Sequence, residues 1–303
     1  MARAAVTGPG SRILTAAVEG GRLRDPDADP TTVPWWSLTK TALAAAALAL
    51  VAGGALALDR QLSGRAFTLR QLLQHTAGLP DYGGLRDYDE AVARGDAPWS
   101  DERLLTRVDA ERLLFPPGQG WAYSNVGYLL VRRLVEQAAT EDLDAALRRL
   151  VFAPLGVSGA CVAREPTDLA GTAWGNTAGY HPGWVYHGLI LGTPAEAALF
   201  LHRLLTGRLL PPGLLHVMCE PRPLGGPVPG RPWRTAGYGL GLMIDVASAR
   251  GRCLGHTGQG PGSTSAAYHF PDLDPPATAA AFASVDDQAV VEEAVLGSWP
   301  ARR

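Results

Sequence analysis

The alternation of hydrophobic and polar residues predicts β-strands near both ends of the chain. Residues 12–24 form two short runs on either side of Gly20-Gly21, a pattern typical of a β-hairpin with a tight turn. Near the C-terminus, strand-like runs occupy residues 238–246, 265–270 and 278–285. The two ends of the chain therefore both supply strands, which we expect to share one sheet.

Helical patterns dominate the region between these strands. Apolar residues recur at helical spacing over residues 37–51, 68–75, 101–114, 125–137, 142–152, 193–205 and 286–299, and a helix beginning near 211 passes into a Pro/Gly/Arg-rich loop that ends at 236. The start at Thr193 is the clearest, because an N-cap Thr is followed by Pro194 and Glu196. Residues 80–100, with one possible short helix, and 156–192 are irregular.

This arrangement predicts an α+β fold. We expect an antiparallel sheet flanked by helices and built from N- and C-terminal segments, with an inserted all-helical subdomain. Residues 1–34 plus 193–303 would form the sheet subdomain, and residues 35–192 would form the helical subdomain. An active site is expected in the cleft between them.

The composition is that of a folded, weakly acidic protein. Hydrophobic residues make up 47% of the chain and charged residues 18%, and the formal net charge is −2. Without a basic field or a run of like charges, we expect no nucleic-acid partner. Residues 41–58 carry no charge, but they are rich in Ala and interrupted by Gly53-Gly54, which favours a buried helix over a membrane span. We therefore expect no membrane partner.

Cysteine and histidine usage gives no indication of a metal or cofactor. Cys161, Cys219 and Cys253 form no CxxC pair and leave an odd thiol, which favours a reducing compartment. His181 and His187 share one loop without further ligands at zinc spacing. Residues 1–12 lack the apolar core of a signal peptide. We predict a cytoplasmic protein with no metal and no cofactor.

Lys40 is the most informative single residue. It is the one Lys among 27 basic residues, and the other 26 are Arg. Coding bias could leave a lone Lys anywhere, but only Lys can lose its proton and act as a base. Ser37 lies one helical turn before Lys40, so the amine can reach the hydroxyl. A neutral Lys40 would then activate Ser37 as a nucleophile, although an S-x-x-K spacing also occurs by chance.

A second segment, Tyr123-Ser124-Asn125, directly precedes a predicted helix. A Tyr near an ammonium group can have a lowered pKa and shuttle a proton as phenolate, and an Asn amide can both donate and accept hydrogen bonds. Taken alone, the segment is better explained as an ordinary aromatic followed by a helix N-cap at Asn125. Its meaning depends on where the fold places it.

The third segment, His256-Thr257-Gly258, lies within a Gly-rich stretch. Glycines beside a strand allow a substrate to lie against its backbone and to pair with it like an added strand. The alternative is a hairpin turn that carries a surface histidine.

The order S-x-x-K, Y-x-N, H-T-G resembles the penicillin-recognising serine hydrolases, in the branch of class C β-lactamases, serine esterases, D,D-peptidases and D-aminopeptidases. Residues 72–80 and 238–242 also look like segments of that family, and the resemblance covers roughly residues 12–299. It implies a β-lactamase/transpeptidase-like fold and a small ester, amide or short peptide as substrate. Relatives usually have a helix before the first strand, and none is evident here.

The resemblance also implies roles for individual residues. Ser37 would be acylated, Lys40 and Tyr123 would form a coupled general base, and Tyr123 would protonate the leaving group. Asn125 would orient Lys40 and the substrate. The oxyanion hole would consist of the backbone N–H groups of Ser37 and Gln259.

The H-T-G segment departs from the K-T-G of β-lactamases. His256, Thr257 and Gly258 would still line the substrate site, but His256 replaces a fixed cation with a titratable imidazole. We therefore expect esters or amides with a less acidic tail to fit better than carboxylate-bearing β-lactams. His75 matches a family position that we interpret as structural.

Bulky aromatics near the nucleophile leave two interpretations open. Trp35 and Trp36 precede Ser37 where smaller residues are usual, so they either pack in the core or wall the acyl pocket. The aromatics of residues 174–186 could likewise line a cleft or fill a core.

The sequence thus predicts a serine hydrolase that acts on an ester or amide through an acyl-serine, with β-lactams and D-amino-acid peptides among the candidate substrates. Alternatives are an acyltransferase that uses the same acyl-enzyme and a catalytically silent, ligand-binding homologue. The joint presence of Ser37, Lys40, Tyr123 and Asn125 argues against the silent homologue.

Overall fold

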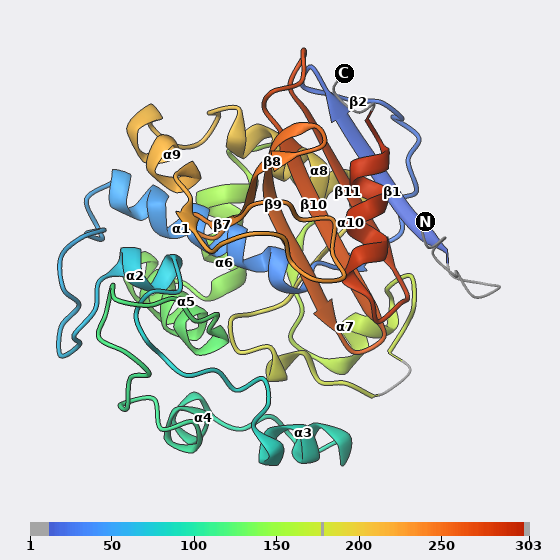
Figure 1. Cartoon of the computed structure of the whole chain (residues 1–303). Coiled ribbons are helices and arrows are strands. Elements are labelled where there is room, and N and C mark those ends of the chain that lie inside the picture. The colour runs from blue at the N-terminus through green and yellow to red at the C-terminus, as the bar shows by residue number, and fades with distance from the viewer. Residues whose placement is uncertain (1–11, 177–178, 300–303) are drawn as a thin grey trace.

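The computed structural model describes residues 12–176 and 179–299, which form an eight-stranded antiparallel sheet in the order β2-β1-β11-β10-β9-β8-β7-β6 with helices on both faces (Figure 1). The N-terminal strand β1 (Ile13–Glu19) pairs along its whole length with the C-terminal strand β11 (Ala277–Ala283). The predicted α+β fold is confirmed. The expectations for residues 1–11, no signal peptide and no helix, lie outside the described residues.

The other strands of this sheet are β2 (Arg22–Leu23), β6 (Arg222–Pro223), β7 (Ala236–Tyr238), β8 (Met243–Ser248), β9 (Gly251–Gly260) and β10 (Ser263–Phe270). The single strand predicted over residues 238–246 is wrong, because the chain turns between β7 and β8. Gly241 makes that turn with φ +73°, and a Cβ there would lie 2.5 Å from the Cβ of Ala44. The H-T-G segment lies within β9, as the strand interpretation required.

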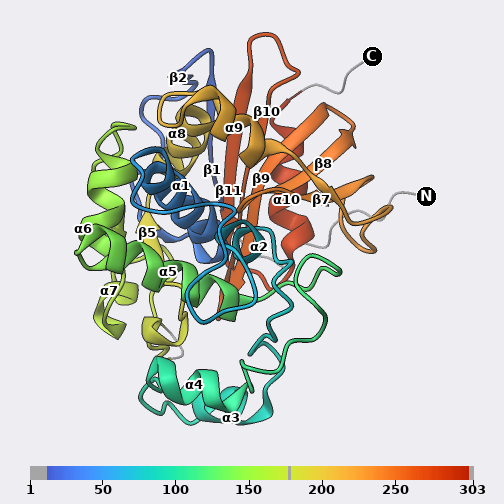
Figure 2. The ribbon, with the colours of Figure 1, turned by 90° about the vertical axis from the view of Figure 1, so that its left-hand side faces the viewer.

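Strands β10 and β11 are buried at every residue because helices cover both faces of the sheet. Helix α10 (Gln288–Gly297) packs on one face, and α8 (Pro194–Leu205) packs on the other (Figure 2). Five of the seven residues of β11 are Ala, and small side chains allow helices to approach a sheet closely. The centre of the sheet is therefore a rigid support for β9.

Helix α1 (Thr39–Ala52) lies within the helical layer, on the α8 side of the sheet (Figure 2). Its apolar residues surround the whole helix, as expected of a helix buried on every side. A 3₁₀ turn, η1 (Trp36–Leu38), precedes it, so the predicted helix begins as a tighter turn that contains Ser37. Across residues 12–176 and 179–299, no helix has both the length and the apolarity needed to cross a membrane.

The remaining helical elements are α2 (Leu69–Leu73), α3 (Arg86–Ala93), α4 (Asp101–Arg107), α5 (Asn125–Ala139), α6 (Leu143–Leu147), the π-helical turn η2 (Arg148–Phe152), α7 (Pro166–Ala170), the 3₁₀ turn η3 (Pro182–Trp184) and α9 (Pro212–Cys219). Helix α5 packs against α1. Helix α4 is shorter than predicted, because Asp109 adopts φ +53° and turns the chain away.

A second, three-stranded sheet joins β3 (Val33–Pro34), β5 (Ile190–Gly192) and β4 (Cys161–Val162). Strands this short leave no alternating pattern, so the sequence did not predict them. The sheet connects the chain just before Ser37 to the end of the irregular segment 156–192. Residues far apart in the sequence are thereby held beside the start of α1.

Candidate active site

Ser37 and Lys40 meet at the junction of η1 and α1. The distance from Lys40 Nζ to Ser37 Oγ is 3.0 Å, and Lys40 Nζ also lies 3.1 Å from Nε2 of His187. Lys40 is 0% exposed, and this burial lowers its pKa to about 7, while the carboxylate of Asp81 acts in the opposite direction. A large fraction of Lys40 is therefore neutral near pH 7.

The backbone before the nucleophile is strained. Trp36 adopts φ +46°, a left-handed conformation that is costly for a bulky residue. Its indole Nε1 donates a 2.9 Å hydrogen bond to Ser263 Oγ on β10, which holds the ring in place. The left-handed conformation of Trp36 turns the chain sharply, so that Ser37 faces β9 at the start of the helix.

Two glycines allow β9 to pass against this turn. A Cβ at Gly258 would lie 2.5 Å from the backbone nitrogen of Ser37, and a Cβ at Gly260 would collide with the ring of Trp36. Only glycine fits at either position without a shift of the backbone. Gly258 thus determines how closely β9 approaches the nucleophile.

Tyr123 reaches the same point from the loop before α5. Its phenol lies close enough to the Ser37 side chain for that contact to lower its pKa, and Lys40 Nζ lies 5.1 Å from its ring centroid. The imidazole of His75 supports the loop: its Nδ1 accepts a 3.1 Å hydrogen bond from the backbone N–H of Ser124, and its ring lies 4.4 Å from that of Tyr123. This agrees with the structural interpretation of His75.

Burial raises the pKa of Tyr123 well above its usual range, and the contact with Ser37 offsets this only in part. The sequence analysis allowed the opposite, a pKa lowered by the ammonium of Lys40. Desolvation dominates here because the phenol is enclosed, and the charges that act on its pKa are Asp81, which raises it, and Arg231, which lowers it. Tyr123 is therefore protonated near neutral pH.

Asn125 is held by a partner that the sequence analysis missed. Its backbone N–H donates to Asp81 Oδ1 at 2.7 Å, and its amide Nδ2 donates to Asp81 Oδ2 at 3.1 Å. Burial raises the pKa of Asp81, while these hydrogen bonds and Lys40 act to lower it. Asp81 directly follows the 72–80 segment, which is the one signal that could have indicated it.

His256 on β9 is neutral and buried. Its Nε2 lies 2.9 Å from the hydroxyl of Tyr238, and burial lowers its pKa to about 3. The alternative of a surface histidine is wrong, because His256 is 1% exposed. His256 therefore supplies no positive charge to the site near neutral pH.

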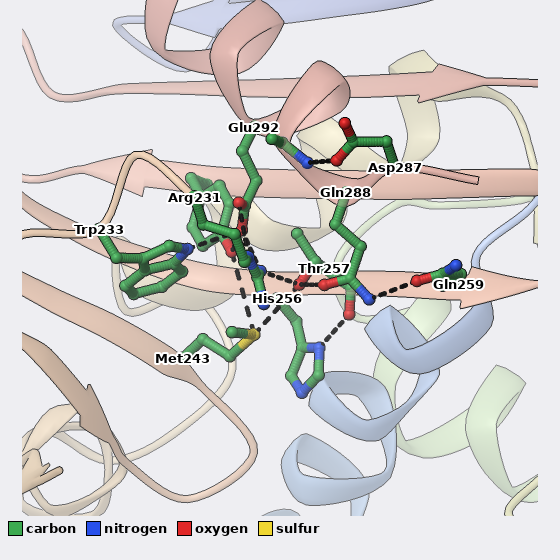
Figure 3. A network of polar contacts seen from close by, with 11 residues as sticks. Arg231, Trp233, Met243, His256, Thr257, Gln259, Asp287, Gln288 and Glu292 are labelled. Atoms are coloured by element: carbon green, nitrogen blue, oxygen red, sulfur yellow. Dashed lines mark hydrogen bonds and ion pairs between the residues drawn. The ribbon is translucent and has the colours of Figure 1, made fainter. Parts of the chain in front are cut away.

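A guanidinium group instead lies beside the H-T-G segment (Figure 3). Arg231, from the loop before β7, donates to Thr257 Oγ1 at 2.8 Å and to Glu292 Oε2 at 2.8 Å. Glu292 is 1% exposed and also accepts from the Trp233 indole at 2.8 Å. Because Glu292 pairs with Arg231, the two groups together add no net charge to the site.

Gln259 completes the row of β9 residues at the site (Figure 3). Its Oε1 accepts a 2.9 Å hydrogen bond from Gln288 of α10, and its Nε2 donates to Asp286 Oδ1 at 2.5 Å. Pairing of β8 with β9 begins at Met243 opposite Gly255, so residues 256–260 pair on the β10 side within the described strands. The H-T-G end of β9 thus forms an edge that faces the cleft.

Ser37 lies where two adjoining pockets meet. A pocket of about 160 Å³ is mainly aromatic, and its lining includes Trp36, Tyr82, Tyr88, Tyr180 and Trp184. A pocket of about 400 Å³ is mainly polar, and its lining includes Tyr123, Arg231, His256, Thr257 and Gln288. Ser37, Asn125 and Gln259 line both pockets, so the cleft has an aromatic arm and a polar arm on either side of the Ser37 hydroxyl.

The aromatic arm answers both open questions about bulky residues. Trp36 walls the cleft, whereas Trp35 packs in the core against Phe152 and Phe200. Among the aromatics of residues 174–186, Tyr180 and Trp184 do both: they line the aromatic arm and belong to a second core cluster behind it, whereas Tyr186 belongs to that core cluster and does not line the arm.

Within the described residues, no group of three His, Cys, Asp or Glu side chains is placed to hold a metal ion.

Comparison with known proteins identifies the class. The beta-lactamase family model matches residues 2–293, so the chain belongs to the beta-lactamase family. The resemblance stated from the sequence motifs is confirmed.

Two curated relatives match parts of the chain. Penicillin-binding protein 4* of Bacillus subtilis (strain 168) is 32% identical over 111 residues, 33% of this chain and 23% of that protein. Esterase EstB of Burkholderia gladioli is 34% identical over 155 residues, 44% of this chain and 39% of that protein. Both matches span well under half the length of the relative.

Solved structures share the fold over almost the whole chain. A D-stereospecific amidohydrolase from Streptomyces sp. has a TM-score of 0.74 at 23% identity, with 95% of this chain and 94% of that chain covered. D-amino acid amidase from Ochrobactrum anthropi SV3, complexed with D-phenylalanine, has a TM-score of 0.74 at 21% identity, with 94% and 90% covered. The names of these relatives agree with the predicted class, a serine hydrolase of the β-lactamase-related type.

Proposed function

We propose that the chain cleaves an ester or amide through an acyl intermediate on Ser37. The site would be the cleft between a sheet subdomain, residues 1–34 plus 193–303, and a helical subdomain, residues 35–192. One observation supports this most directly: a Lys with a pKa of about 7 lies 3.0 Å from a Ser hydroxyl at the start of a helix. A neutral amine at that distance can accept the hydroxyl proton.

The proposed reaction begins when Ser37 Oγ attacks the substrate carbonyl carbon and its proton passes to Lys40 Nζ. The negative oxygen would be stabilised by the backbone N–H groups of Ser37 and Gln259, where the first turn of the helix also favours negative charge. The bond to the leaving group then breaks, and the leaving group takes a proton from the Tyr123 hydroxyl. Tyr123 regains its proton from the Lys40 ammonium group. Lys40 would then take a proton from a water that attacks the acyl carbon, and would return that proton to Ser37 Oγ as the bond between Ser37 and the acyl group breaks.

The two arms of the cleft support a particular kind of substrate. The aromatic arm offers apolar surface and suits an uncharged aromatic or branched group next to the scissile carbonyl. In the polar arm, Thr257 and Gln288 offer hydrogen bonds, while Arg231 is charge-paired with Glu292. We therefore propose a neutral ester or amide, and not an anionic β-lactam, as the preferred substrate.

The test combines covalent labelling with a substrate panel. A fluorescent phosphonate should label the intact protein on Ser37, located by peptide mapping, and Ser37→Ala should abolish the label. Kinetics with p-nitrophenyl esters, D-amino-acid amides and cephalosporins should give the highest kcat/KM for a neutral ester or amide.

Each outcome decides between the candidate functions. Absence of label between about pH 6 and 9 would support the silent homologue. Labelling with turnover only after addition of an alcohol or amine acceptor would support the acyltransferase. A clear preference for cephalosporins would contradict the substrate class while leaving the acyl-serine mechanism intact.

We include a cytoplasmic location in the proposal. All three cysteines, Cys161, Cys219 and Cys253, are free thiols, which fits a reducing compartment.

A further inference from the structure

His187 contacts Lys40 at the point where the proposed base meets the nucleophile. Among the described residues, the hydrogen-bond partners of Lys40 Nζ are Ser37 Oγ at 3.0 Å and the His187 ring, with Nε2 at 3.1 Å and Nδ1 at 3.5 Å. His187 is 3% exposed and lines the aromatic arm together with Ser37. The sequence analysis considered it only as a metal ligand.

Backbone pairing fixes this contact across 147 residues of chain. In the antiparallel pair of β3 and β5, Pro34 lies opposite Leu191, and the Trp35 N–H donates to the Ile190 carbonyl at 2.8 Å. The chain that leads into β5 therefore runs beside the chain that leaves β3 toward Ser37.

Two neighbours of His187 strengthen this arrangement. The Ile190 N–H donates to Thr39 Oγ1 at 3.1 Å, which ties β5 directly to the first residue of α1. Gly188 turns the chain with φ +89°, and a Cβ there would collide with Leu143. The imidazole is thus held on the same side of α1 as the Lys40 amine.

A neutral amine needs this kind of partner to act as a base. It has two N–H bonds and one lone pair, and only the lone pair can take the proton of Ser37. An acceptor that holds one N–H in a fixed direction determines where the lone pair points. His187 can be that acceptor, because burial and the nearby Lys40 hold its pKa well below the usual value and keep one ring nitrogen unprotonated.

We propose that His187 is a positioning residue that directs the lone pair of Lys40 toward Ser37. The inference rests on the proposed function of Ser37 and Lys40. The family resemblance implied Asn125 for this role, but the Asn125 amide donates to Asp81. His187 therefore takes over a task that the motif pattern assigned elsewhere.

Lys40 is the group at this site whose titration falls near neutral pH. The titratable side chains around it are His75, Asp81, Tyr123, Tyr128, His187 and His256. Burial lowers the pKa of each of these histidines and raises the pKa of each tyrosine. Burial also raises the pKa of Asp81, so a pH effect near 7 reports the state of Lys40 together with that carboxyl.

The sole Lys of the chain makes the direct measurement simple. Protein labelled with ¹³Cε-lysine gives a single side-chain NMR signal, whose titration reports the pKa of Lys40 without any need for activity. His187→Leu should lower that pKa below the wild-type value, because the ammonium form loses an acceptor. His187→Gln, which retains an acceptor, should bring the pKa of Lys40 most of the way back to the wild-type value.

Kinetics supply the second measurement. His187→Leu should lower kcat by about 10²-fold with little change in KM, as expected of a misdirected base, and should move the acid limb of the pH profile to lower pH. His181→Leu in the same loop is the control: it disturbs a histidine that accepts from the Gly183 N–H, and the acid limb should not move. His187→Ala, which has no acceptor, gives the same comparison if His187→Leu does not fold.

The two proposals fail in different ways. Failure of a phosphonate to label wild-type Ser37 would overturn the proposed function. Normal labelling of wild type, with an unchanged Lys40 titration and unchanged kcat in the folded His187→Leu variant, would overturn the role of His187 alone.

Discussion

Lys40 is placed where a positive charge is costly, and this predicts the pH dependence of the reaction. Its pKa of about 7 means that the amine gains a proton as pH falls through neutrality. Because the proposed base must be uncharged, kcat/KM for a p-nitrophenyl ester should fall below an apparent pKa of about 7. A pH–rate profile of the free enzyme measures this, and a flat profile from pH 5 to 9 would exclude Lys40 as the base.

Lys40→Met is the matched variant, because it keeps the unbranched shape and removes the amine. It should lower kcat by about 10²–10⁴-fold.

Wild-type stability should rise between pH 7 and 10.5, where the folded state has released the Lys40 proton and the unfolded state has not. Denaturant unfolding across that range should show a smaller rise for Lys40→Met.

At the scale of elements, the close approach of β9 to η1 predicts a strict requirement at one glycine. In Gly258→Ala, the added methyl would lie 2.5 Å from the Ser37 nitrogen, so β9 must move away from the nucleophile. Since the displaced strand carries the proposed oxyanion donor, kcat/KM should fall by about 10²-fold. Ester kinetics on the purified variant measure this.

Gly213→Ala is the control for Gly258→Ala. A Cβ at Gly213, in α9, meets nothing within 4 Å, so this change should leave kcat/KM within about twofold and stability equal or slightly higher. Equal, near-normal kinetics in both variants would show that β9 does not limit the geometry at Ser37.

The secondary structure around each site residue determines whether the sequence could predict that residue. Ser37 and Lys40 were predictable because one helical turn fixes their spacing. Tyr123 could be predicted only through a family motif, since its contact with Ser37 depends on a loop. Asp81 and His187 lie in irregular segments, and the strands that place His187 are only two or three residues long. No periodic pattern can reveal a contact of that kind.

The pattern of strands at both ends of the chain and helices between them was enough to predict one sheet that contains strands from both ends. The pairing of β1 with β11 follows from their apolar patterns. The division of the cleft into two arms could not be predicted from the sequence, because it depends on the φ of +46° at Trp36 and on the loops that carry Tyr180 and Arg231. Backbone strain and loop positions are properties of the assembled fold.

The same sheet buries histidines, and this predicts how the stability of the protein responds to acid. His269 on β10 and His202 on α8 both contact Thr278 Oγ1 on β11, with Nδ1 at 2.8 and 3.1 Å. Burial lowers the pKa of His269 to about 3, as it does for His256. Between about pH 6.5 and 3 the unfolded chain therefore binds more protons than the folded protein, so stability falls as pH falls.

His269→Gln removes one of the histidines that bind a proton in the unfolded chain but not in the folded protein. The slope of unfolding free energy against pH, measured by urea titration between pH 4 and 6, should become shallower by up to about 1.4 kcal/mol per pH unit. The slope is the decisive quantity, because loss of the contact with Thr278 also changes stability at every pH. Identical slopes for wild type and His269→Gln would mean that His269 is already protonated in the folded sheet.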